Sequence, residues 1–444
     1  MSRLPVTPPA RLVSLDAYRG FVMLAMVSGG LGFAAIVEQD PAVLSAWDGS
    51  RFDGAWRSLW RMLAYQFEHV AWTGCAFWDL IQPSFMFMVG VALPFSFARR
   101  QAEGHSRYRQ FGHVLFRALV LVALGVFLSS NWSSQTNFTF VNVLTQIGLG
   151  YPFVWLLLGR RTWMQVAALV LILVGYWAYF FQYSMPEAER AQVTAYLTEV
   201  MHKDEAEWNQ FSGLASHWNK HTNAAAAFDR WFLNLFPRAE EPWQGQRFWV
   251  NSGGYQTLNF IPSIATMLLG LIAGQWLLNR KRTPYQKLRR LLLAGAACFA
   301  IALAADTTIW PVQISGANWS LCPVVKRIWT PTWVLFSAGW TFWMLAAFYW
   351  VIDIGGWRRW AFPLVVVGMN SIAMYCMAQL LQPWISKTLR IHLTTADSAF
   401  GTDAVSTLFG DRSRYQPLWE SLVQLGVLWL ICGWMYRRKI FIRI

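Results

Sequence analysis

The sequence predicts an all-α, polytopic membrane protein with about ten transmembrane helices and both termini in the cytoplasm. Of its 444 residues, 55% are hydrophobic and only 14% are charged, whereas a soluble domain carries roughly a quarter charged residues. Apolar runs of roughly twenty residues, the length that crosses a bilayer, recur along the whole chain. Basic residues cluster in every second connection between these runs, which is typical of cytoplasmic loops.

The apolar runs give the order of the predicted spans. The first run follows a basic N-terminus, as in a signal peptide, but no cleavage site follows it, so we expect an uncleaved helix. In chain order the spans are predicted at 16–37, 76–98, 114–131, 139–158, 162–183, 255–279, 291–310, 328–351, 360–382 and 417–436. An even number of spans puts both termini on one side, and basic connections such as "NRKRTPYQKLRR" indicate that this side is the cytoplasm.

The other connections, expected on the non-cytoplasmic side, are longer and carry most of the acidic residues. They cover about 38–75, 184–254, 311–327 and 383–416. We therefore expect the polar chemistry on that side or within the membrane. The net charge of +14 comes from the basic loops, so it indicates topology and no nucleic-acid partner. The chain is predicted to form one transmembrane domain, 1–444, with its largest non-cytoplasmic loop at about 184–254.

Few charged residues fall inside the predicted spans, where a carboxylate costs several kcal/mol unless it is paired or hydrated. Asp79, near the start of the second span, is therefore a functional candidate. The alternative is an interfacial residue that binds the backbone of a kinked helix or pairs with an arginine. Asp306 lies late in the seventh span, near the surface, and a structural role is favoured there. Asp16 and Arg19 share a helical face and can form a simple salt bridge.

His69 lies in the loop seven residues before the second predicted span. A surface histidine is usually inert, but Trp72 and further aromatic residues indicate a loop that folds against the membrane interface. Glu68 and Asp79 are placed to orient the imidazole or to raise its basicity. Such a histidine can act as a general base or as a nucleophile toward an activated carbonyl.

The largest loop contains two histidines, His217 and His221, which are four residues apart. They would face the same metal if they were helical, but no third ligand follows at a recognisable spacing, so no metal is expected. The segment 216–238 is predicted to be a partly helical lid outside the membrane. In it Asp229 either pairs with Arg230 or contacts a polar ligand.

Lys326 and Arg327 form a basic pair ahead of the eighth predicted span. Two cations near a helix N-terminus suit an anion such as phosphate, and an interfacial anchor that contacts lipid headgroups is an equal alternative. The five cysteines show no metal-binding spacing. A disulfide between Cys75 and Cys322 is conceivable because both fall on the same predicted side.

Several sequence blocks together carry a family resemblance. They read, in chain order, "SLDAYRGFVMLAMV", "FEHVAWTGCAFWDLIQPSFMFMVG", "NVLTQIGLGY", "PVVKRIWTPTWVLFSAGW", "VGMNSIAMY" and "YRRKIF". In this order they resemble the membrane-embedded heparan-α-glucosaminide N-acetyltransferase family. The histidine–tryptophan–glycine and glycine–methionine–asparagine–serine blocks are the specific ones. The chain looks similar to a bacterial member without the separate luminal domain of the animal enzymes.

The resemblance implies an acyltransferase that takes acetyl from cytoplasmic acetyl-CoA and delivers it to an amino sugar or glycan across the membrane. It implies a multi-pass protein of the bacterial inner membrane, in contact with membrane lipid, and by analogy a homodimer. The family's active histidine maps onto His69, and the aspartate of the following helix maps onto Asp79.

The resemblance and the residue patterns together give the candidate site. The catalytic candidates are His69 and Asp79. The candidates for binding acetyl-CoA are Asp16, Arg19, Lys326, Arg327, Asn370 and Ser371. The candidates for binding the acceptor are Glu68, Trp72, His217 and Asp229. Where the family has an asparagine at the end of the first helix, this chain has Ser28.

The alternative function from another class is a transporter of amino sugars or oligosaccharides. Transporters often contain paired broken helices in two related halves, and no internal repeat is visible in the sequence. We therefore favour the enzyme. A scaffold that has lost catalysis is a third alternative, because of the missing asparagine.

Overall fold

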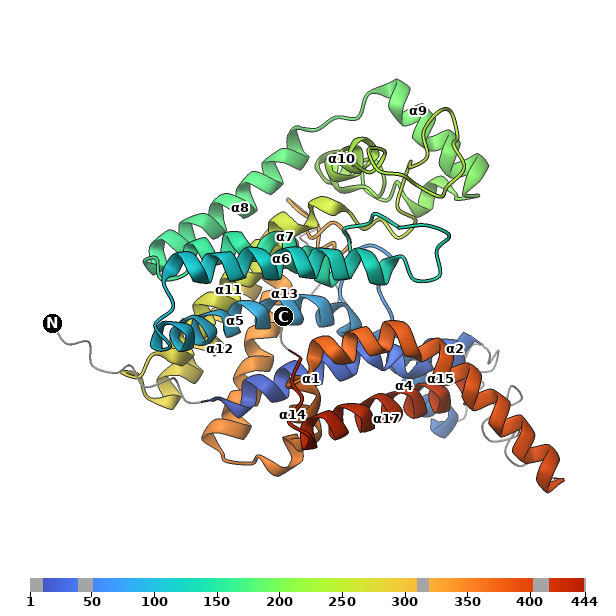
Figure 1. Ribbon diagram of the computed structural model, residues 1–444. Helices are drawn as coiled ribbons and strands as arrows, with labels where there is room; N and C mark the ends of the chain where they lie inside the picture. Colours follow the sequence, from blue (N-terminus) through green and yellow to red (C-terminus); the bar gives the residue numbers. More distant parts are fainter. Residues whose placement is uncertain (1–10, 39–50, 310–318, 402–414, 443–444) are drawn as a thin grey trace. The chain divides into compact units, whose positions relative to one another are not determined.

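The computed structural model describes residues 11–38, 51–309, 319–401 and 415–442 (Figure 1). Helices dominate these residues, and they contain isolated β-bridges but no β-strand. The predicted all-α class is thus confirmed. The described residues form two compact units, and each unit is made of several separate stretches of chain. Whether the chain acts as one domain stays a prediction.

The first unit contains Trp72–Gly74 and Gln82–Trp350. Its long helices are α5 (Ile81–Ala102, from the second residue on), α6 (Arg107–Ser129), α7 (Val143–Leu157), α8 (Thr162–Gln182), α11 (Phe260–Leu278), α12 (Pro284–Ala305) and α13 (Pro331–Phe348). Helix α6 packs along α7 and α12 packs along α13. Helix α11 contacts α7, α8 and α13, so it is the central helix of this unit.

Glycines allow α5 and α11 to approach each other closely. A Cβ atom at Gly270 would clash with the carbonyl oxygen of Phe87, and one at Gly90 would clash with that of Met267. Backbone contact of this kind is typical of helix pairs that associate through small residues in membranes.

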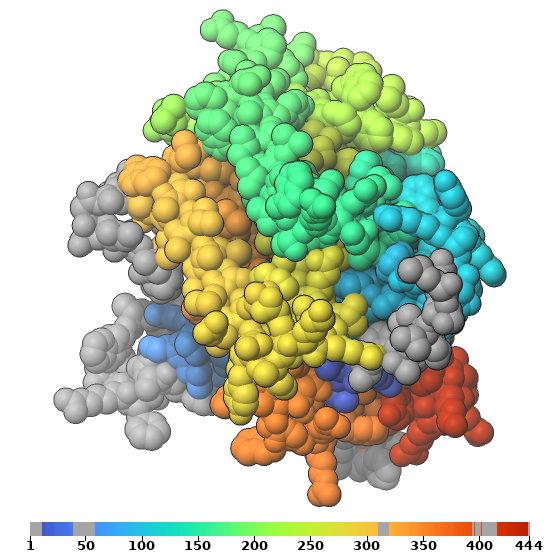
Figure 2. Space-filling view, turned by 90° about the vertical axis from the view of Figure 1, so that its left-hand side faces the viewer, coloured from blue at the N-terminus to red at the C-terminus, as the bar shows by residue number. Residues whose placement is uncertain are grey.

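The outer helices of the first unit present apolar side chains to their surroundings. Leu171 of α8 is 74% exposed and Leu293 of α12 is 61% exposed. Both helices contribute surface to the face in Figure 2, where α8 is green and α12 is yellow. Apolar faces of this kind favour contact with lipid over contact with water.

Residues 183–256 of the first unit, here called the extramembrane segment, connect α8 to α11. They contain helices α9 (Glu187–Ala195) and α10 (Ala224–Leu233), joined by short helical turns (Figure 1). Asn223 caps α10 by accepting a hydrogen bond from the Ala226 N–H. The prediction of a partly helical segment at 216–238 is confirmed.

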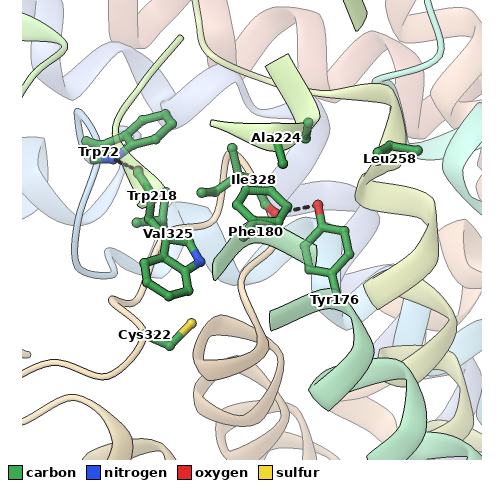
Figure 3. Packing of buried hydrophobic residues seen from close by; sticks show 10 residues of the cluster. Trp72, Tyr176, Phe180, Trp218, Ala224, Leu258, Cys322, Val325 and Ile328 are labelled. Atoms are coloured by element: carbon green, nitrogen blue, oxygen red, sulfur yellow. Dashed lines mark hydrogen bonds between the residues drawn. The ribbon is translucent and has the colours of Figure 1, made fainter. Parts of the chain in front are cut away.

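Two buried clusters hold the extramembrane segment in place. The first is its own core of Val193, Leu197, Trp208 and Trp249. The second joins the segment to the long helices and contains Trp72, Tyr176, Phe180, Trp218, Ala224, Ala225, Leu258, Cys322, Val325 and Ile328 (Figure 3). In this second cluster the Tyr176 hydroxyl donates to the Ile328 carbonyl at 3.1 Å, which fixes α8 to the turn before α13.

The second unit contains, within the described residues, Leu12–Ala71, Cys75–Ile81 and the chain from Val351 onward. Its helices are α1 (Val13–Val27), α2 (Phe33–Glu38), α4 (Arg51–Gln66), α14 (Phe362–Gly368), α15 (Ser371–Phe400) and α17 (Gln416–Arg437). Helix α1 crosses α14 where Gly20 meets the Leu364 carbonyl and Gly368 meets the Asp16 carbonyl.

Two spans of the second unit are broken. Helices α1 and α2 are joined by the 3₁₀ turn Gly29–Gly32, and the pair is bent by 43°. The pair formed by the helical stretch Arg359–Gly368 and α15 is bent by 69°. The sequence predicted unbroken helices at 16–37 and 360–382. The glycine run explains the first break, because all four residues of Gly29–Gly32 adopt positive φ angles and three of them are glycines, which tolerate this conformation.

The count of spans is close to the prediction. Among the described residues, seven helices are long and apolar enough to cross a membrane, and nine if each bent pair is one span. The remaining predicted span, the fourth at 139–158, corresponds to α7, which has only 15 residues. Helix α15 continues past the predicted end at 382, through Pro383, into the predicted loop. The cytoplasmic placement of the termini stays a prediction. Parts of the predicted loops and the end of the seventh span lie outside the described residues, namely 39–50, 310–318 and 402–414.

Candidate active site

The two catalytic candidates lie next to each other in the second unit. Nδ1 of His69 is 2.8 Å from Oδ1 of Asp79. The aspartate side chain is only 1% exposed, whereas the histidine side chain is 39% exposed. A buried carboxylate therefore contacts an imidazole that remains open to a ligand.

The Asp79 carboxylate is also bound to the backbone of the loop that carries His69. Its Oδ2 accepts hydrogen bonds from the N–H groups of Val70 at 3.3 Å and Ala76 at 3.1 Å. Asp79 belongs to the 3₁₀ turn Phe77–Leu80, at the point where the chain enters α5. The carboxylate thus holds both sides of the loop, and these contacts offset the cost of its burial.

The orientation of the imidazole decides which nitrogen can react. Because an ionised carboxylate only accepts hydrogen bonds, Nδ1 of His69 carries the proton toward Asp79. The other nitrogen, Nε2, is then the basic one of the ring, and it is the atom that can accept a proton or attack a carbonyl. The Trp78 ring, whose centroid is 6.4 Å from that of His69, borders the imidazole.

Aromatic packing and one glycine support the start of this loop. The Phe67 ring packs against Phe77 and Phe33, with centroid distances of 5.7 and 5.1 Å. The backbone carbonyl of Phe67 lies against Gly30, where a Cβ atom would be 2.6 Å from the oxygen. Gly30 also has a φ of +70°. The broken first span therefore packs directly beneath the residues that lead to His69.

Replacing Gly30 by alanine is expected to lower the free energy of unfolding by about 1–3 kcal/mol, because the new methyl group meets backbone and the φ angle is strained. Activity should fall as well, since Phe67 must shift and His69 follows it by two residues. Thermal unfolding in detergent and a transfer assay measure the two effects. Gly29, with a similar φ but open space around its Cβ position, is the control, and equal losses in both variants would contradict the packing argument.

Other candidates of the second unit have structural partners. Asp16 and Arg19 form an ion pair at 3.8 Å, and Arg19 also donates to the Gly368 carbonyl at 3.4 Å. The predicted salt bridge is confirmed, and it ties α1 to α14. Ser28, the 5% exposed C-cap residue of α1, donates a hydrogen bond from its hydroxyl to the Ala25 carbonyl of that helix. Glu68 is exposed, so of the two carboxylates considered for orienting His69, Asp79 makes the contact.

Asn370 holds the C-terminal stretch of the described chain. Its Nδ2 donates to the Ile440 carbonyl, and its Oδ1 accepts from the Ile442 N–H, both at 3.0 Å. Ser371 follows it at the start of α15 and is 8% exposed. The predicted contact of Asn370 and Ser371 with the acyl donor is not tested by this arrangement and stays a prediction.

The remaining candidates lie in the first unit. Trp72 is 2% exposed and its indole N–H donates to the Trp218 carbonyl at 3.1 Å (Figure 3). Nδ1 of His217 is 3.0 Å from the Tyr183 carbonyl oxygen. Both side chains therefore help to fix the extramembrane segment. Their predicted contact with the acceptor stays a prediction.

Asp229 is 1% exposed and links α10 to the entry of α11. Its Oδ2 accepts a hydrogen bond from the Thr257 N–H at 2.9 Å. Burial raises the pKa of this carboxyl to about 7, against smaller opposing effects of the Thr257 contacts and of Arg230 and Arg238. Arg230 instead forms an ion pair with Glu189 at 2.8 Å. The main partner of this arginine is therefore Glu189 and not Asp229, which was one of the two predicted alternatives.

The free energy of unfolding is expected to fall as the pH rises from about 4 to about 7, by up to about 4 kcal/mol from Asp229 alone. The unfolding free energy falls with pH because the raised pKa keeps the carboxyl of Asp229 protonated in the folded protein while the unfolded chain loses this proton. The contribution of Asp229 to stability is therefore fully present at low pH and is lost as the pH rises to about 7. Melting temperatures of the wild type and Asp229→Asn over this range measure it. A wild-type slope that the variant retains would contradict the assignment.

Lys326 and Arg327 precede α13 without capping it. Lys326 is 2% exposed, so it is poorly placed to contact lipid headgroups. Arg327 donates to the Gly253 carbonyl at 2.7 Å and lies 5.5 Å from the centroid of the Tyr255 ring. The cap of α13 is Thr330, whose Oγ1 accepts from the Trp333 N–H. An anion at the N-terminus of α13 would therefore compete with the Thr330 hydroxyl for a backbone N–H group.

The two histidines of the large loop do not form a metal site in the described structure. His217 belongs to the 3₁₀ turn Gly213–Trp218, and His221 has a φ of +71° and lies outside any helix. Burial, followed by the charges of Lys220 and Arg230, lowers the pKa of His221 to about 3. Within the described chain no three His, Cys, Asp or Glu side chains come together around a possible ion. Cys75 and Cys322 are free thiols, so the conceivable disulfide is absent.

Sequence reasoning overlooked Arg117, a cation inside the predicted third span. In α6 its guanidinium lies 4.7 Å from the centroid of the Tyr151 ring, and Nη1 is 3.3 Å from the Tyr151 hydroxyl. The signal was present, since a charge within an apolar run is a functional candidate by default.

Comparison with known proteins supports the resemblance seen in the sequence blocks. No protein-family model matches the chain. The human heparan-alpha-glucosaminide N-acetyltransferase is 24% identical over 476 residues, covering 100% of this chain and 61% of the human protein. The mouse protein of the same name is 22% identical over 415 residues, covering 86% of this chain and 57% of the mouse protein. The chain therefore spans about three fifths of the length of the curated relatives it matches.

Proposed function

Because the chain resembles the heparan-alpha-glucosaminide N-acetyltransferases along its whole length, we propose that it is a membrane-embedded acetyltransferase. Its donor is acetyl-CoA, bound from the cytoplasm, and its acceptor is the amine of an amino sugar or glycan on the other side of the membrane. The single observation that carries the proposal is the contact between the open imidazole of His69 and the buried carboxylate of Asp79.

The chemistry of this pair suits acetyl transfer to nitrogen. Nε2 of His69 accepts the proton that the amine loses as its nitrogen forms a bond with the acetyl carbon. The C–S bond of the thioester breaks, and the imidazolium returns the proton to the departing sulfur. Asp79 keeps the imidazole in the reactive tautomer and stabilises its transient positive charge. In the alternative order, Nε2 first takes the acetyl group itself and then passes it to the amine.

Donor binding is assigned to the remaining polar candidates. Arg19, Lys326 and Arg327 supply positive charge for phosphates, and Ser371 supplies a hydroxyl. Asn370 keeps one amide hydrogen beyond its bonds to Ile440 and Ile442. We further propose that the protein resides in a bacterial inner membrane, in contact with its lipids.

One structural observation favours the transporter as a second candidate. Two spans of the second unit are broken, with bends of 43° and 69°, and broken helices often line the binding sites of secondary transporters. Labelled acetyl-CoA and a panel of amino sugars, with purified protein in detergent, test the enzyme. If no acetyl group is transferred while labelled sugar crosses liposomes that contain the protein, the transporter replaces it.

A further inference from the structure

Helix α10 of the extramembrane segment carries large apolar side chains on its outer side. Trp231 is 62% exposed, and Leu235, in the turn that follows the helix, is 63% exposed. The turn continues the helix, because the Leu235 N–H donates to the Phe232 carbonyl at 3.2 Å. Trp231 and Leu235 are four residues apart, so they lie on the same side of the helix.

The charged residues of α10, in contrast, point into the protein. Asp229 and Arg230 are both buried, and their partners, the Thr257 N–H and the Glu189 carboxylate, belong to the same unit. A helix that borders water normally has its apolar residues toward the core and its charged residues toward the solvent. Helix α10 has the reverse arrangement, so its outer face suits an apolar environment.

The contacts of α10 place it level with the ends of membrane-spanning helices. The Tyr179 hydroxyl donates to the carbonyl of Ala224, the first residue of α10, at 3.4 Å. Tyr179 lies three residues before the end of α8, about 4.5 Å along the helix axis. Thr257, to which Asp229 binds, is the first residue of the candidate span that contains α11.

The other end of α10 meets the start of α7. The Phe232 ring packs against that of Phe140 at a centroid distance of 5.7 Å, and α7 begins three residues later, at Val143. Only the four residues 158–161 connect α7 to α8, so the chain reverses there, and the start of α7 and the end of α8 lie on the same side of the membrane. Helix α10 therefore extends across the ends of the spans, near the plane of the membrane surface.

The outer face of α10 continues the surface that α8 presents to lipid. Leu171, Val174 and Tyr179 of α8 are exposed, and Tyr179 is also the residue that contacts α10. Tryptophan and tyrosine are enriched where a membrane meets water, because their rings are apolar and carry one polar group. Trp231 and Tyr179 thus have the chemistry that this level of the membrane favours.

We propose that α10 is an interfacial helix, and that Trp231, Phe232 and Leu235 insert into the boundary between the lipid headgroups and the acyl chains. Helices of this kind bury an apolar face about 5–10 Å deep in that boundary. The extramembrane segment is then attached to the membrane surface through α10, and the lid predicted at 216–238 is fixed at this helix. This proposal does not depend on acetyl transfer.

Spin labels on the full chain in phospholipid vesicles test the proposal. Trp231→Cys and, as a second position, Leu235→Cys are labelled with a nitroxide. The signal of the equally treated wild type, whose five cysteines are free thiols, is subtracted. The collision partners are oxygen, which dissolves in lipid, and a nickel chelate, which stays in water. We expect the ratio of oxygen to nickel collisions at both positions to be several-fold higher than at a control position.

Val200→Cys provides this control. Val200 is also an exposed apolar residue of the extramembrane segment, but it follows the exposed Glu199, so it is expected to border water. Equal ratios of oxygen to nickel collisions at all three positions would overturn the proposal. Labels at positions 231 and 235 that are immobile and shielded from both reagents would also overturn it, because a protein surface would then cover the face.

A charged substitution gives a second measurement that needs no label. Trp231→Asp is expected to lower the melting temperature in vesicles, because a carboxylate is costly to place in lipid. Trp231→Phe, which keeps an aromatic ring, should leave it nearly unchanged. Val200→Asp introduces the same charge at the control position, and a loss for Trp231→Asp no larger than the loss for Val200→Asp would count against the insertion of α10.

Discussion

His69→Ala is expected to lower kcat for acetyl transfer by about 10²- to 10⁴-fold, the usual contribution of a positioned acid–base group. KM for the sugar should change little, because the imidazole acts on the proton and not on the sugar ring. The variant should fold, since the histidine side chain is 39% exposed and Asp79 keeps its hydrogen bonds from the Val70 and Ala76 N–H groups. Initial rates with labelled acetyl-CoA measure the effect.

His113→Ala is the matched control for this experiment. His113 is an exposed histidine of α6 in the first unit. In the sequence it is far from every residue that is assigned to the reaction. A rate for His69→Ala within about twofold of the control would remove the histidine from the mechanism. A trapped acetyl group on the wild-type imidazole would distinguish the nucleophile from the base.

Asp79→Asn is expected to reduce kcat by about 10²- to 10⁴-fold, because the amide no longer favours the reactive tautomer of His69. It should also lower the free energy of unfolding by about 1–3 kcal/mol, since the Val70 and Ala76 N–H groups and His69 then compete for one oxygen. Melting temperature and rate are therefore measured on the same sample.

Two further substitutions make the Asp79 result interpretable. Glu103→Gln removes an equal charge from an exposed residue at the cytoplasmic end predicted for α5, and it should leave the rate unchanged. Asp79→Glu keeps the charge and should recover part of the rate if orientation is the role of the carboxylate. A stable Asp79→Asn variant with full activity would contradict the pairing.

The sequence was sufficient for the helical class and for the central pair. Hydrophobic length predicts most of the spans, because the cost of burying backbone in lipid leaves few alternatives. His69 and Asp79 could be connected from sequence since only a short loop separates them, and a carboxylate at a helix entry needs a partner.

Other features depended on contacts between distant residues. No local pattern predicts that the Asn370 amide binds the backbone at Ile440 and Ile442, or that Arg327 donates to the Gly253 carbonyl. The break between α14 and α15 was missed for the same reason: Asn370 lies at the break, but its backbone partners, Ile440 and Ile442, are 70 and 72 residues away in the sequence. The break after α1 did have a local signal in its glycines.

The broken spans affect how the protein fits bilayers of different thickness. A straight helix such as α12, with 22 residues, is about 33 Å long, close to the hydrocarbon thickness of about 30 Å. A bent pair can change its bend angle and so adapt its height at low cost, whereas a straight helix must tilt or deform the lipid around it. At the first break, Gln382 of α15 donates to the carbonyl of Val27, the last residue of α1, at 2.7 Å, so this carbonyl is not left to the lipid. Hydrophobic mismatch would then act mainly on the unbroken spans, and the choice of lipid for reconstitution should be guided by their length.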